Sequence, residues 1–449
     1  LRGTDLTIDN YANHIATLTR TYTDALQYVA NQGAQLGGVL VHSGAEHHYY
    51  GDDRGVAFQA FGHLLHWIPV NRPNQFVYFR SSEKPIYFQI VPSDFWYEQD
   101  IDVQPDWEET LTIVRLSSLD ELLAQLTLHS VADVAYIGGH ADIAASLGID
   151  KALINPKKLL AYLDFSRAVK TDYELEQLRE ANCIALLGHA AAKARFLEGR
   201  SEYEIHMAFL QATQNLEDEC PYTNIVALNE KAAILHYQFK RKTNTDKGQV
   251  LLIDAGCRVK AYGSDITRTS VSDNVHPVFS SLVSAMETLE LALVDEVKPG
   301  KTYQSLHAST LTRIARVLID HNICAGEAED LVELNIPQLF MPHGVGHLLG
   351  IQVHDVGGHQ SDTDGAILPP PENSPALRNT RVMEADMVFT VEPGLYFIPL
   401  ILEAERRSDC SKLINWNAVD ELYPCGGIRI EDNIRVTSDG AENLTRQFE

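Results

Sequence analysis

The sequence predicts a protein of two domains that mix helices and strands, and three observations support this α/β (α+β) fold class. Its 449 residues exceed the usual size of a single domain. Short apolar segments typical of strands alternate with helical segments over residues 1–165. A helix start then follows, and strand-like segments that end in isolated acids or histidines lie between residues 250 and 436. We therefore expect one domain over residues 1–165 and a second over residues 166–449.

Composition narrows the class of protein. Apolar residues make up 45% and charged residues 22%, which is typical of a globular chain and excludes a disordered or fibrous one. The 61 acidic and 36 basic residues give a net charge of −25, which argues against nucleic acid and anionic membranes as partners because both require clustered Lys and Arg. No run has the roughly 18 apolar residues of a membrane span, and no signal segment is seen. The six cysteines form no C-x-x-C pair and indicate reduced thiols, so we expect a cytoplasmic protein.

Three segments of the N-terminal domain read as strands. They are residues 37–41 (GGVLV), 75–79 (QFVYF) and 84–90 (KPIYFQI). Residues 47–66 contain several histidines and aromatic residues without a clean period. We expect a long loop there, and loops of this length are often functional or form interfaces.

The C-terminal domain begins with a recognisable helix start. Thr171 and Glu174 have the spacing of a capping box, and Gly199 is a plausible C-cap of the same helix. Between them, apolar residues recur at helical spacing: Leu175, Leu178, Ala181 and Ile184. A further helix is expected over residues 303–320, and residues 361–385, which contain three consecutive prolines, read as a long loop.

Five segments of this domain carry side chains that can bind metal ions or take part in catalysis. They are residues 250–256 (VLLIDAG), 262–269 (YGSDITRT), 343–355 (HGVGHLLGIQVHD), 388–394 (VFTVEPG) and 426–432 (GGIRIED). A carboxylate at the end of a buried strand is costly unless it is paired or binds a metal. A hairpin would bring Asp254 and Asp265 together, although two ordinary strand-end acids remain the simpler reading of either segment alone. The segments complete neither a G-x-G-x-x-G fingerprint nor an H-E-x-x-H motif.

From these segments a set of two aspartates, two glutamates and one histidine can be assembled. A set rich in oxygen with one imidazole suits two divalent ions such as Mn²⁺, with Co²⁺, Zn²⁺ or Fe²⁺ as alternatives. Two such ions, held ~3.5 to 4 Å apart, can share a water, lower its pKa and polarise a carbonyl oxygen.

The five segments, in this order, resemble the metal motifs of the pita-bread metallopeptidases, the family of aminopeptidase P, prolidase, creatinase and methionine aminopeptidase. Residues 224–230 (NIVALNE) and 394–398 (GLYFI) look most like the bacterial Xaa-Pro dipeptidases, including those called organophosphorus acid anhydrolases. The resemblance covers the whole chain and implies a creatinase-like α/β domain followed by a pita-bread catalytic domain. It departs at Cys257, Ala261 and Leu348. None of them is a ligand position, so the expected activity stands, and substrate preference is the property that these departures put in doubt.

The resemblance implies a role for each residue of the metal site. The implied metal ligands are Asp254, Asp265, His347, Glu392 and Glu431. Asp265 and Glu431 would bridge the two ions, and Glu392 would also be the general base or proton shuttle for the attacking water. His343 and His354 would donate hydrogen bonds to the scissile carbonyl, unless they only orient the loop.

Further residues are implied around the substrate. Arg429 resembles the arginine that supports the proton network on the metal side, and a salt bridge with a nearby acid is its simpler reading. His236 resembles a substrate-side histidine and Tyr222 an aromatic of the pocket wall, with a structural histidine and a core tyrosine as the alternatives. The resemblance also implies a homodimer in which Asp52 or Asp53, on the loop of residues 47–66, meets the amino group of the partner's substrate.

Arg378 discriminates between two activities. In prolidases an arginine fourteen residues before the equivalent of Glu392 binds the free carboxylate of the substrate, a task that suits the planar guanidinium. A solvated loop arginine is the alternative. A carboxylate beside the proline means a dipeptide, so we expect hydrolysis of Xaa-Pro dipeptides. The Xaa-Pro amide has no N–H. Its hydrolysis therefore needs an enzyme that does not bind the substrate through a hydrogen bond from the N–H of the scissile amide.

Two other functions stay open at this stage. Aminopeptidase P activity on longer Xaa-Pro peptides is the first, and a metal-free pita-bread module that binds proteins is the second. The second is disfavoured because all five ligand positions hold residues that can bind metal. Hydrolysis of organophosphorus esters or fluorides is a side activity implied only by the resemblance.

Overall fold

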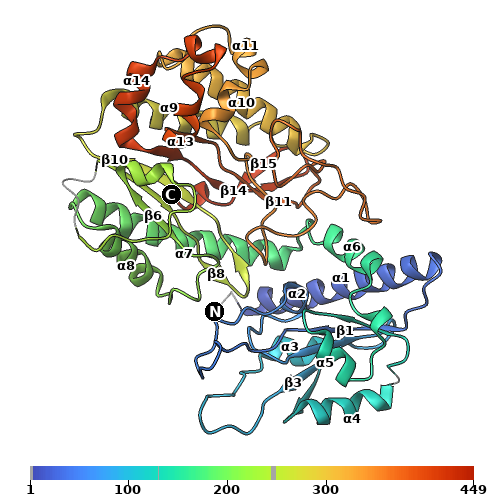
Figure 1. The fold of residues 1–449 in the computed structure, drawn as a ribbon. Coiled ribbons are helices and arrows are strands. Elements are labelled where there is room, and N and C mark those ends of the chain that lie inside the picture. The colour runs from blue at the N-terminus through green and yellow to red at the C-terminus, as the bar shows by residue number, and fades with distance from the viewer. Residues whose placement is uncertain (1–3, 130, 244–248) are drawn as a thin grey trace. The chain divides into compact units, whose positions relative to one another are not determined.

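The computed structural model describes residues 4–129, 131–243 and 249–449, and these form two compact units (Figure 1). The first unit contains the residues up to Glu176 together with Asp362–Ala366. The second contains Gln177–Ser361 and Ile367–Glu449. Each unit combines helices with β-sheet, as predicted.

The first unit is built on a mixed five-stranded sheet in the order β4-β3-β2-β1-β5. Its strands are β1 (Gly38–His42), β2 (Phe76–Phe79), β3 (Ile86–Ile90), β4 (Thr112–Leu116) and β5 (Val134–Ile137). Its helices are α1 (Thr4–Asn31), α2 (Gly62–Trp67), α3 (Pro105–Thr110), α4 (Leu119–His129), α5 (Ala141–Ser146) and α6 (Lys157–Ser166). The pairs β1–β5 and β3–β4 are parallel, and the pairs β1–β2 and β2–β3 are antiparallel.

Both faces of this sheet are covered, which explains why its central strands are apolar without alternation. On one face, Leu40 and Phe88 pack with Leu122 and Leu126 of α4. On the other, Tyr22 of α1 packs edge-to-face against Trp67 of α2, with ring centroids 4.9 Å apart. The three strands predicted in this unit are confirmed as β1, β2 and β3.

The long loop expected over residues 47–66 is shorter than predicted. Residues 62–66 belong to α2, and all six residues of this helix are buried. The stretch GHLLHW is apolar enough to bury completely, and this favours a helical turn over an exposed loop. Before α2 the chain makes a tight turn closed by a bridge between His48 and Gly55.

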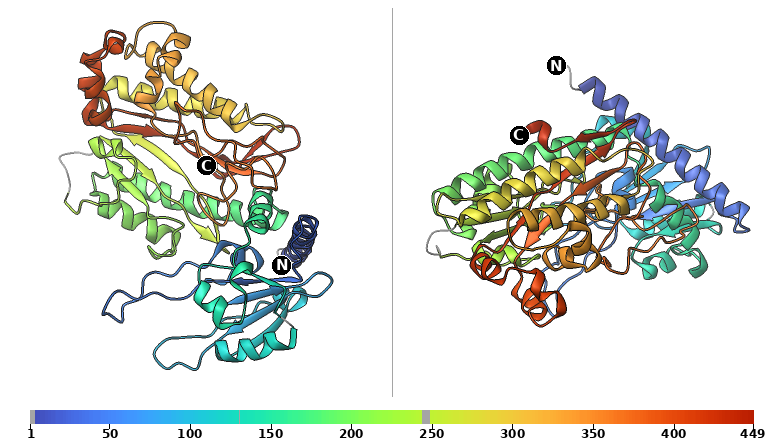
Figure 2. Two further views of the ribbon diagram at one scale, coloured as in Figure 1. Left: turned by 45° about the vertical axis from the view of Figure 1, so that its right-hand side comes forward. Right: turned by 90° about the horizontal axis from the view of Figure 1, so that it is seen from above.

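The second unit places strands between two layers of helices (Figures 1 and 2). On one side lie α7 (Asp172–Leu197) and α8 (Glu202–Thr213), and on the other α9 (Pro277–Val294) and α10 (Tyr303–Asp320). The shorter helices are α11 (Ala328–Glu333), α12 (Ile336–Phe340), α13 (Pro399–Glu405) and α14 (Trp416–Leu422).

The strands of this unit form small antiparallel sheets. The sheet β10-β7-β6 consists of β6 (Ile225–Leu228), β7 (Val250–Asp254) and β10 (Thr267–Val271), and the sheet β11-β14-β15 of β11 (Val388–Val391), β14 (Asp432–Val436) and β15 (Ala441–Asn443). Two-stranded pairs are β8 (Arg258–Val259) with β9 (Tyr262–Gly263), and β12 (Gly394–Tyr396) with β13 (Gly427–Arg429). A bridge between Thr267 and Glu431 joins the first sheet to the last segment of the predicted site.

The helix signals in the sequence are confirmed. The amide of Thr171 donates to the Glu174 carboxylate at 2.8 Å, and the amide of Glu174 donates to Thr171 Oγ1 at 3.4 Å, which makes a capping box. Gly199 follows the end of α7 with a φ of +75°. The helix predicted over residues 303–320 is α10. Residues 361–385, all of them described, form neither helix nor strand, as expected of a long loop.

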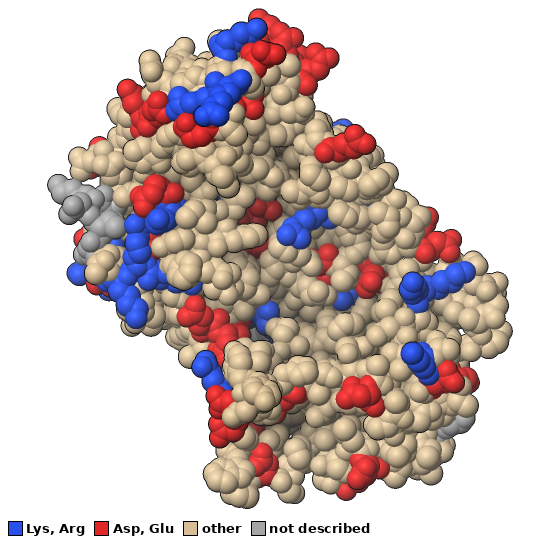
Figure 3. All heavy atoms as spheres, in the orientation of Figure 1, with Lys and Arg blue, Asp and Glu red and all other residues tan. Residues whose placement is uncertain are grey.

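One helix, α9, is long and apolar enough to match a membrane span by length and composition. Several of its residues, among them Phe279, Leu282 and Met286, are buried in the second unit, as expected of a core helix. On the face shown in Figure 3, basic side chains are interspersed with acidic ones.

Candidate metal centre

The two aspartates of the first two motifs come together through an antiparallel strand pair. Asp254 is the last residue of β7, and its Cα lies opposite that of Thr267 at the start of β10. Asp265 stands two residues before Thr267, and both aspartates are buried. Asn433 holds the backbone of Asp265 from both sides, since its side chain accepts from the Asp265 amide at 3.0 Å and donates to the Asp265 carbonyl.

His347 faces this pair from the glycine-rich segment. Its Nδ1–H donates to the carbonyl of Leu348 at 3.0 Å, so Nε2 is the ring nitrogen that points inward. Nε2 lies 3.3 Å from Asp265 Oδ2 and 3.7 Å from Glu392 Oε1. A backbone carbonyl that takes the second ring N–H is the usual support of a metal-binding histidine.

Gly346 lets this segment approach β11 closely. Its φ of +150° is unfavourable for residues with a Cβ, and a Cβ built there would lie 2.3 Å from the carbonyl oxygen of Thr390 and 2.3 Å from the Tyr303 hydroxyl. The amide of His347 donates to Thr390 Oγ1 at 3.1 Å. The glycine therefore fixes the position of the histidine beside it.

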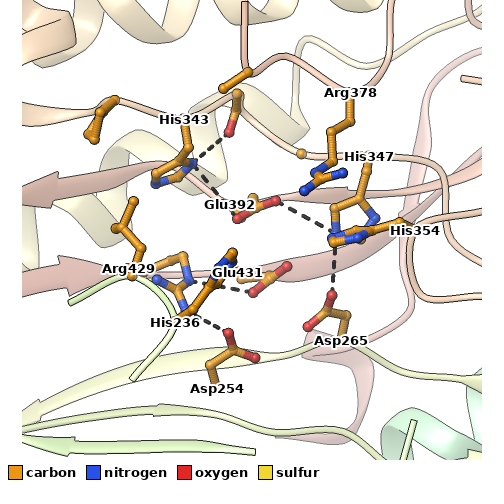
Figure 4. A pocket seen from close by; sticks show the side chains of 15 residues that line it. His236, Asp254, Asp265, His343, His347, His354, Arg378, Glu392, Arg429 and Glu431 are labelled. Atoms are coloured by element: carbon orange, nitrogen blue, oxygen red, sulfur yellow. Dashed lines mark hydrogen bonds and ion pairs between the residues drawn. The ribbon is translucent and has the colours of Figure 1, made fainter. Parts of the chain in front are cut away.

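The two glutamates complete the cluster from neighbouring strands. Glu392 directly follows β11, and Glu431 lies between β13 and β14. Glu431 is almost fully buried and accepts a hydrogen bond of 2.6 Å from Thr267 Oγ1. Asp265, His347 and Glu431 offer ligand atoms that all lie within 4.8 Å of one another. Figure 4 shows the four acids and His347 directed into one cavity.

Arg429 connects the cluster to a network of polar side chains. Its guanidinium donates to Asp254 Oδ2 at 2.6 Å, to Thr267 Oγ1 at 3.0 Å and to the Tyr396 hydroxyl at 2.9 Å. Its Nε lies 3.9 Å from Glu431 Oε2. A salt bridge with a nearby acid was the simpler reading of Arg429, and the structure shows the arginine paired with Asp254 and close to Glu431.

Burial and crowding change the ionisation of the acids. Burial raises the pKa of Asp254 to about 6 and that of Glu392 to about 7, and it raises the pKa of Glu431 well above its usual range. The neighbouring acids raise all three pKa values further because like charges repel. Burial also acts on Asp265, but the hydrogen bond and charge of His347 outweigh it and hold the pKa of Asp265 below its ordinary value.

These residues fit a pair of divalent cations. Asp254 Oδ1 is buried without a hydrogen-bond partner among the described residues, and its free lone pairs suit a cation. Four carboxylates this close cannot all ionise unless positive charge compensates them. Two divalent ions would replace the protons, and hard oxygen donors with one imidazole are ligands that such ions accept.

His343 and His354 flank the cluster. The Nδ1–H of His343 donates to the carbonyl of Gly344 at 2.7 Å, and its Nε2 lies 3.0 Å from the Tyr396 hydroxyl, so both ring nitrogens are engaged. Burial lowers the pKa of His343 to about 3, so the ring is neutral and Nε2 accepts from Tyr396. The ring of His354 packs edge-to-face against that of His347, with centroids 4.4 Å apart.

The cavity above the cluster has a volume of about 260 Å³. Its wall includes His236 and Arg378, both exposed, besides Leu235, Pro342 and Ala376. Figure 4 shows the Arg378 guanidinium directed toward the cluster from the side opposite Asp254. The structure thus brings the predicted substrate-side arginine and histidine to the same cavity as the acids.

The remaining predicted residues have different positions. The Tyr222 hydroxyl is buried near the cluster, where burial and the charges of Asp254 and Asp265 raise its pKa well above 10. Asp52 and Asp53 are exposed in the first unit, where Asp52 accepts from the amide of Arg54 at 3.1 Å. Their approach to a partner's substrate stays a prediction.

Sequence reasoning missed the side chains that support the ligands. Thr267 bonds both Glu431 and Arg429, and Tyr396 bonds both Arg429 and His343. Thr267 stands two residues after Asp265 and begins β10, and this short spacing was a usable signal. No comparable signal marked Tyr396 or Asn433.

Comparison with known proteins agrees with this geometry. Residues 176–438 match the model of metallopeptidase family M24, and residues 9–165 match that of the Xaa-Pro dipeptidase N-terminal domain. The chain belongs to metallopeptidase family M24. It is 42% identical to an Xaa-Pro dipeptidase of Shewanella oneidensis over 98% of both chains. It is 40% identical to an Xaa-Pro dipeptidase of Shewanella pealeana, over 96% of this chain and 98% of the relative.

Solved structures show the M24 fold. Zinc-substituted aminopeptidase P of Escherichia coli, in complex with product, superposes with a TM-score of 0.73 at 23% identity and covers 96% of each chain. Proline aminopeptidase P II from Yersinia pestis gives 0.72 at 24% identity, covering 96% of this chain and 97% of its own. The prediction of an N-terminal α/β domain followed by a pita-bread metallopeptidase domain is therefore confirmed. M24 metallopeptidases use a dinuclear site of divalent metal ions, and the acids and His347 of this chain fit one.

Proposed function

We propose that this M24 metallopeptidase hydrolyses Xaa-Pro dipeptides. The observation that carries the proposal is the position of Arg378, a cation in the wall of the cavity whose floor holds the cluster of acids and His347. The curated relatives, about 40% identical over nearly the whole chain, are named Xaa-Pro dipeptidases. Residues 1–165 would form the N-terminal domain and residues 166–449 the catalytic one.

Five residues would hold two divalent ions, and Mn²⁺ suits the oxygen-rich set best. They are Asp254, Asp265, His347, Glu392 and Glu431. When bound, the ions lower the pKa of a shared water and polarise the carbonyl of the substrate. The hydrogen bonds that Arg429 makes to Asp254 and Thr267 orient the ligands on one side.

Glu392 has the properties of a proton acceptor and donor. Burial raises the pKa of Glu392 to about 7 in the metal-free chain, and the charge of bound metal ions would lower it and leave the carboxylate ionised, ready to accept a proton. Its carboxylate reaches toward both His347 and His343, at 3.7 and 3.9 Å. In the proposed reaction Glu392 takes a proton from the attacking water and returns it to the proline nitrogen, which becomes the leaving amine.

The substrate is held by groups around the cavity. Arg378 would bind the free carboxylate of the proline through two parallel hydrogen bonds. His236 and His354 lie at the same cavity and can donate to the peptide carbonyl. Nε2 of His343 accepts a hydrogen bond from the Tyr396 hydroxyl. It can donate to the peptide carbonyl only after it gives up this bond and becomes protonated. Tyr222 would form part of the buried wall.

A homodimer would complete the site if Asp52 or Asp53 of one subunit met the substrate's amino group in the other. The free thiols of all six cysteines support a cytoplasmic setting for the enzyme. Organophosphorus esters and fluorides would be side substrates, because the same activated water can attack phosphorus.

The direct test compares Xaa-Pro dipeptides with Xaa-Pro-Xaa tripeptides of the same first residue, with Mn²⁺ supplied. We expect kcat/KM to be higher for the dipeptides. Preference for the tripeptides would replace this proposal with aminopeptidase P activity. A second test measures the divalent metal content of the purified protein and the dipeptidase activity of Asp254→Asn. If the protein retained no divalent ion and the substitution left activity unchanged, a metal-free binding module would be the better explanation.

A further inference from the structure

A second cluster of metal-binding side chains lies in the first unit. His14 of α1, His66 of α2 and Glu174 of α7 come from three separate segments, and all three are buried. Each offers one ligand atom, and these atoms lie within 4.8 Å of one another. His66 Nε2 is 3.3 Å from one carboxylate oxygen of Glu174, and His14 Nδ1 is 3.9 Å from the other.

The ring of His14 is oriented as in metal sites. His14 Nε2 lies 2.8 Å from the carbonyl of His66, so this nitrogen must carry the hydrogen and Nδ1 must present its lone pair to Glu174 and Thr171. A metal-binding histidine typically donates its other N–H to a backbone carbonyl in this way. Burial lowers the pKa of His66 to about 4, so its ring is also neutral at pH 7.

The distances suit a small tetrahedral ion. Zinc bound to nitrogen and oxygen at 2.0 to 2.1 Å separates its ligand atoms by roughly 3.3 Å. His66 Nε2 and the Glu174 oxygen nearest to it have this separation. The three ligand atoms lie within 4.8 Å of one another, so the other pairs would close by at most about 1.5 Å. The hydroxyl of Thr171, now 2.8 Å from His14 Nδ1, would turn wholly to Glu174, to which it already lies 3.1 Å away.

Space exists for a fourth ligand. A cavity of about 170 Å³ lies against the cluster, and His66, Glu174 and Thr171 line it together with His63 and Tyr22. Three protein ligands with an open fourth position are typical of zinc sites that keep a water or bind a small molecule. Lys170 lies close enough to lower the pKa of Glu174, and its charge would weaken cation binding without blocking it.

We propose that His14, His66 and Glu174 form a mononuclear site for a divalent transition metal, foremost Zn²⁺, separate from the dinuclear centre. The ion would tie α1 and α2 to the first turn of α7. Its fourth position would hold water or a small ligand from the adjoining cavity. The site is independent of the proposed peptidase activity, because none of its residues lines the catalytic cavity.

The test compares zinc bound by the full-length protein and two variants after equilibration with ZnCl₂ and removal of free metal. His66→Ala removes a ligand, whereas His63→Ala is the matched control, since His63 is also buried on α2 and lines the same cavity but pairs with Asp164. We expect the wild type and His63→Ala to retain one zinc ion per chain more than His66→Ala. Zinc in the dinuclear centre is common to all three and cancels in the difference.

Equal zinc contents in the three proteins would overturn the proposal. Because His66→Ala removes a buried side chain and can impair folding, a second measurement uses the wild type alone. Anomalous diffraction at the zinc edge from crystals soaked in ZnCl₂ is expected to show a peak between His14, His66 and Glu174. Electron density without an anomalous peak at that position would also overturn it.

Discussion

Arg429 donates a hydrogen bond of 2.6 Å to Asp254, a pairing between β13 and β7 that joins residues 175 positions apart. The same guanidinium reaches Thr267 and Tyr396, so its planar fork holds three partners at fixed angles. Since Tyr396 in turn donates to His343, the arginine links the metal side of the cavity to the histidine at its edge.

Arg429→Lys should weaken metal binding although the positive charge is kept. A lysine is a point charge without the planar fork, and losing a partner that orients a metal ligand typically costs 10- to 100-fold in affinity. Metal titration with dipeptidase activity as the readout measures the loss. Arg435→Lys is the matched control, because Arg435 forms a similar fork with Asp386 and Glu442 outside the cavity. Equal affinities in the two variants would contradict the role given to Arg429.

The stability of the metal-free protein should fall as the pH rises from about 5 to 8. The pKa of Glu392 is raised from an ordinary 4.5 to about 7 in the folded chain, so the folded state binds this proton more tightly than the unfolded state. Its contribution, up to roughly 3 kcal/mol, is fully present below pH 4.5 and is lost as the pH rises through 7. The pKa of Asp254, at about 6, acts in the same direction.

Thermal melting after treatment with chelator tests this pH dependence. Glu392→Gln cannot ionise, so its Tm should change less with pH than that of the wild type. Saturating Mn²⁺ should also flatten the profile, because bound cations replace the protons. A metal-free wild type whose Tm has the same slope as that of Glu392→Gln would refute the assignment.

Gly346→Ala should damage both stability and metal binding. The new Cβ would lie 2.3 Å from Thr390 O and from the Tyr303 hydroxyl, both in the packed interior, so the backbone beside His347 has to move. We expect a loss of about 2 to 4 kcal/mol in unfolding free energy. Gly440→Ala is the control, since its nearest neighbour lies 3.9 Å away. Chemical denaturation of the two metal-loaded variants measures the difference, which should be small if the glycine is dispensable.

The local signals in the sequence predicted the secondary structure well, but they did not predict the tertiary contacts that support it. The strands β1, β2 and β3, the capping box at Thr171 and the helix over residues 303–320 all depend on neighbours in the chain, and the structure contains them. The loop expected over residues 47–66 was wrong at its end, because its last residues are buried as α2. Burial of that segment depends on tertiary packing against Tyr22 and Phe79, which periodicity does not report.

In the site, too, local sequence patterns predicted some contacts, and others depend on residues far apart in the chain. The antiparallel pairing of β7 with β10 was foreseeable from two strand-like segments and a short connection, so Asp254 and Asp265 could be placed together. The contacts of Thr267 with Glu431 and Arg429 span more than 160 residues, and no local pattern encodes them. For the same reason the cluster of His14, His66 and Glu174 was invisible in the sequence.

Arg378→Ala should distinguish a dipeptidase from an enzyme for longer peptides. A bidentate bond to a carboxylate is worth about 1.5 to 3 kcal/mol, so kcat/KM for an Xaa-Pro dipeptide should fall about 10- to 100-fold. The loss should be smaller for the corresponding Xaa-Pro amide, which has no terminal carboxylate for the arginine to bind. Arg378→Lys retains the charge without the fork and should give an intermediate rate. Steady-state kinetics on the acid and amide substrates provide the measurement, and equal losses on both would mean that Arg378 acts on something other than the carboxylate.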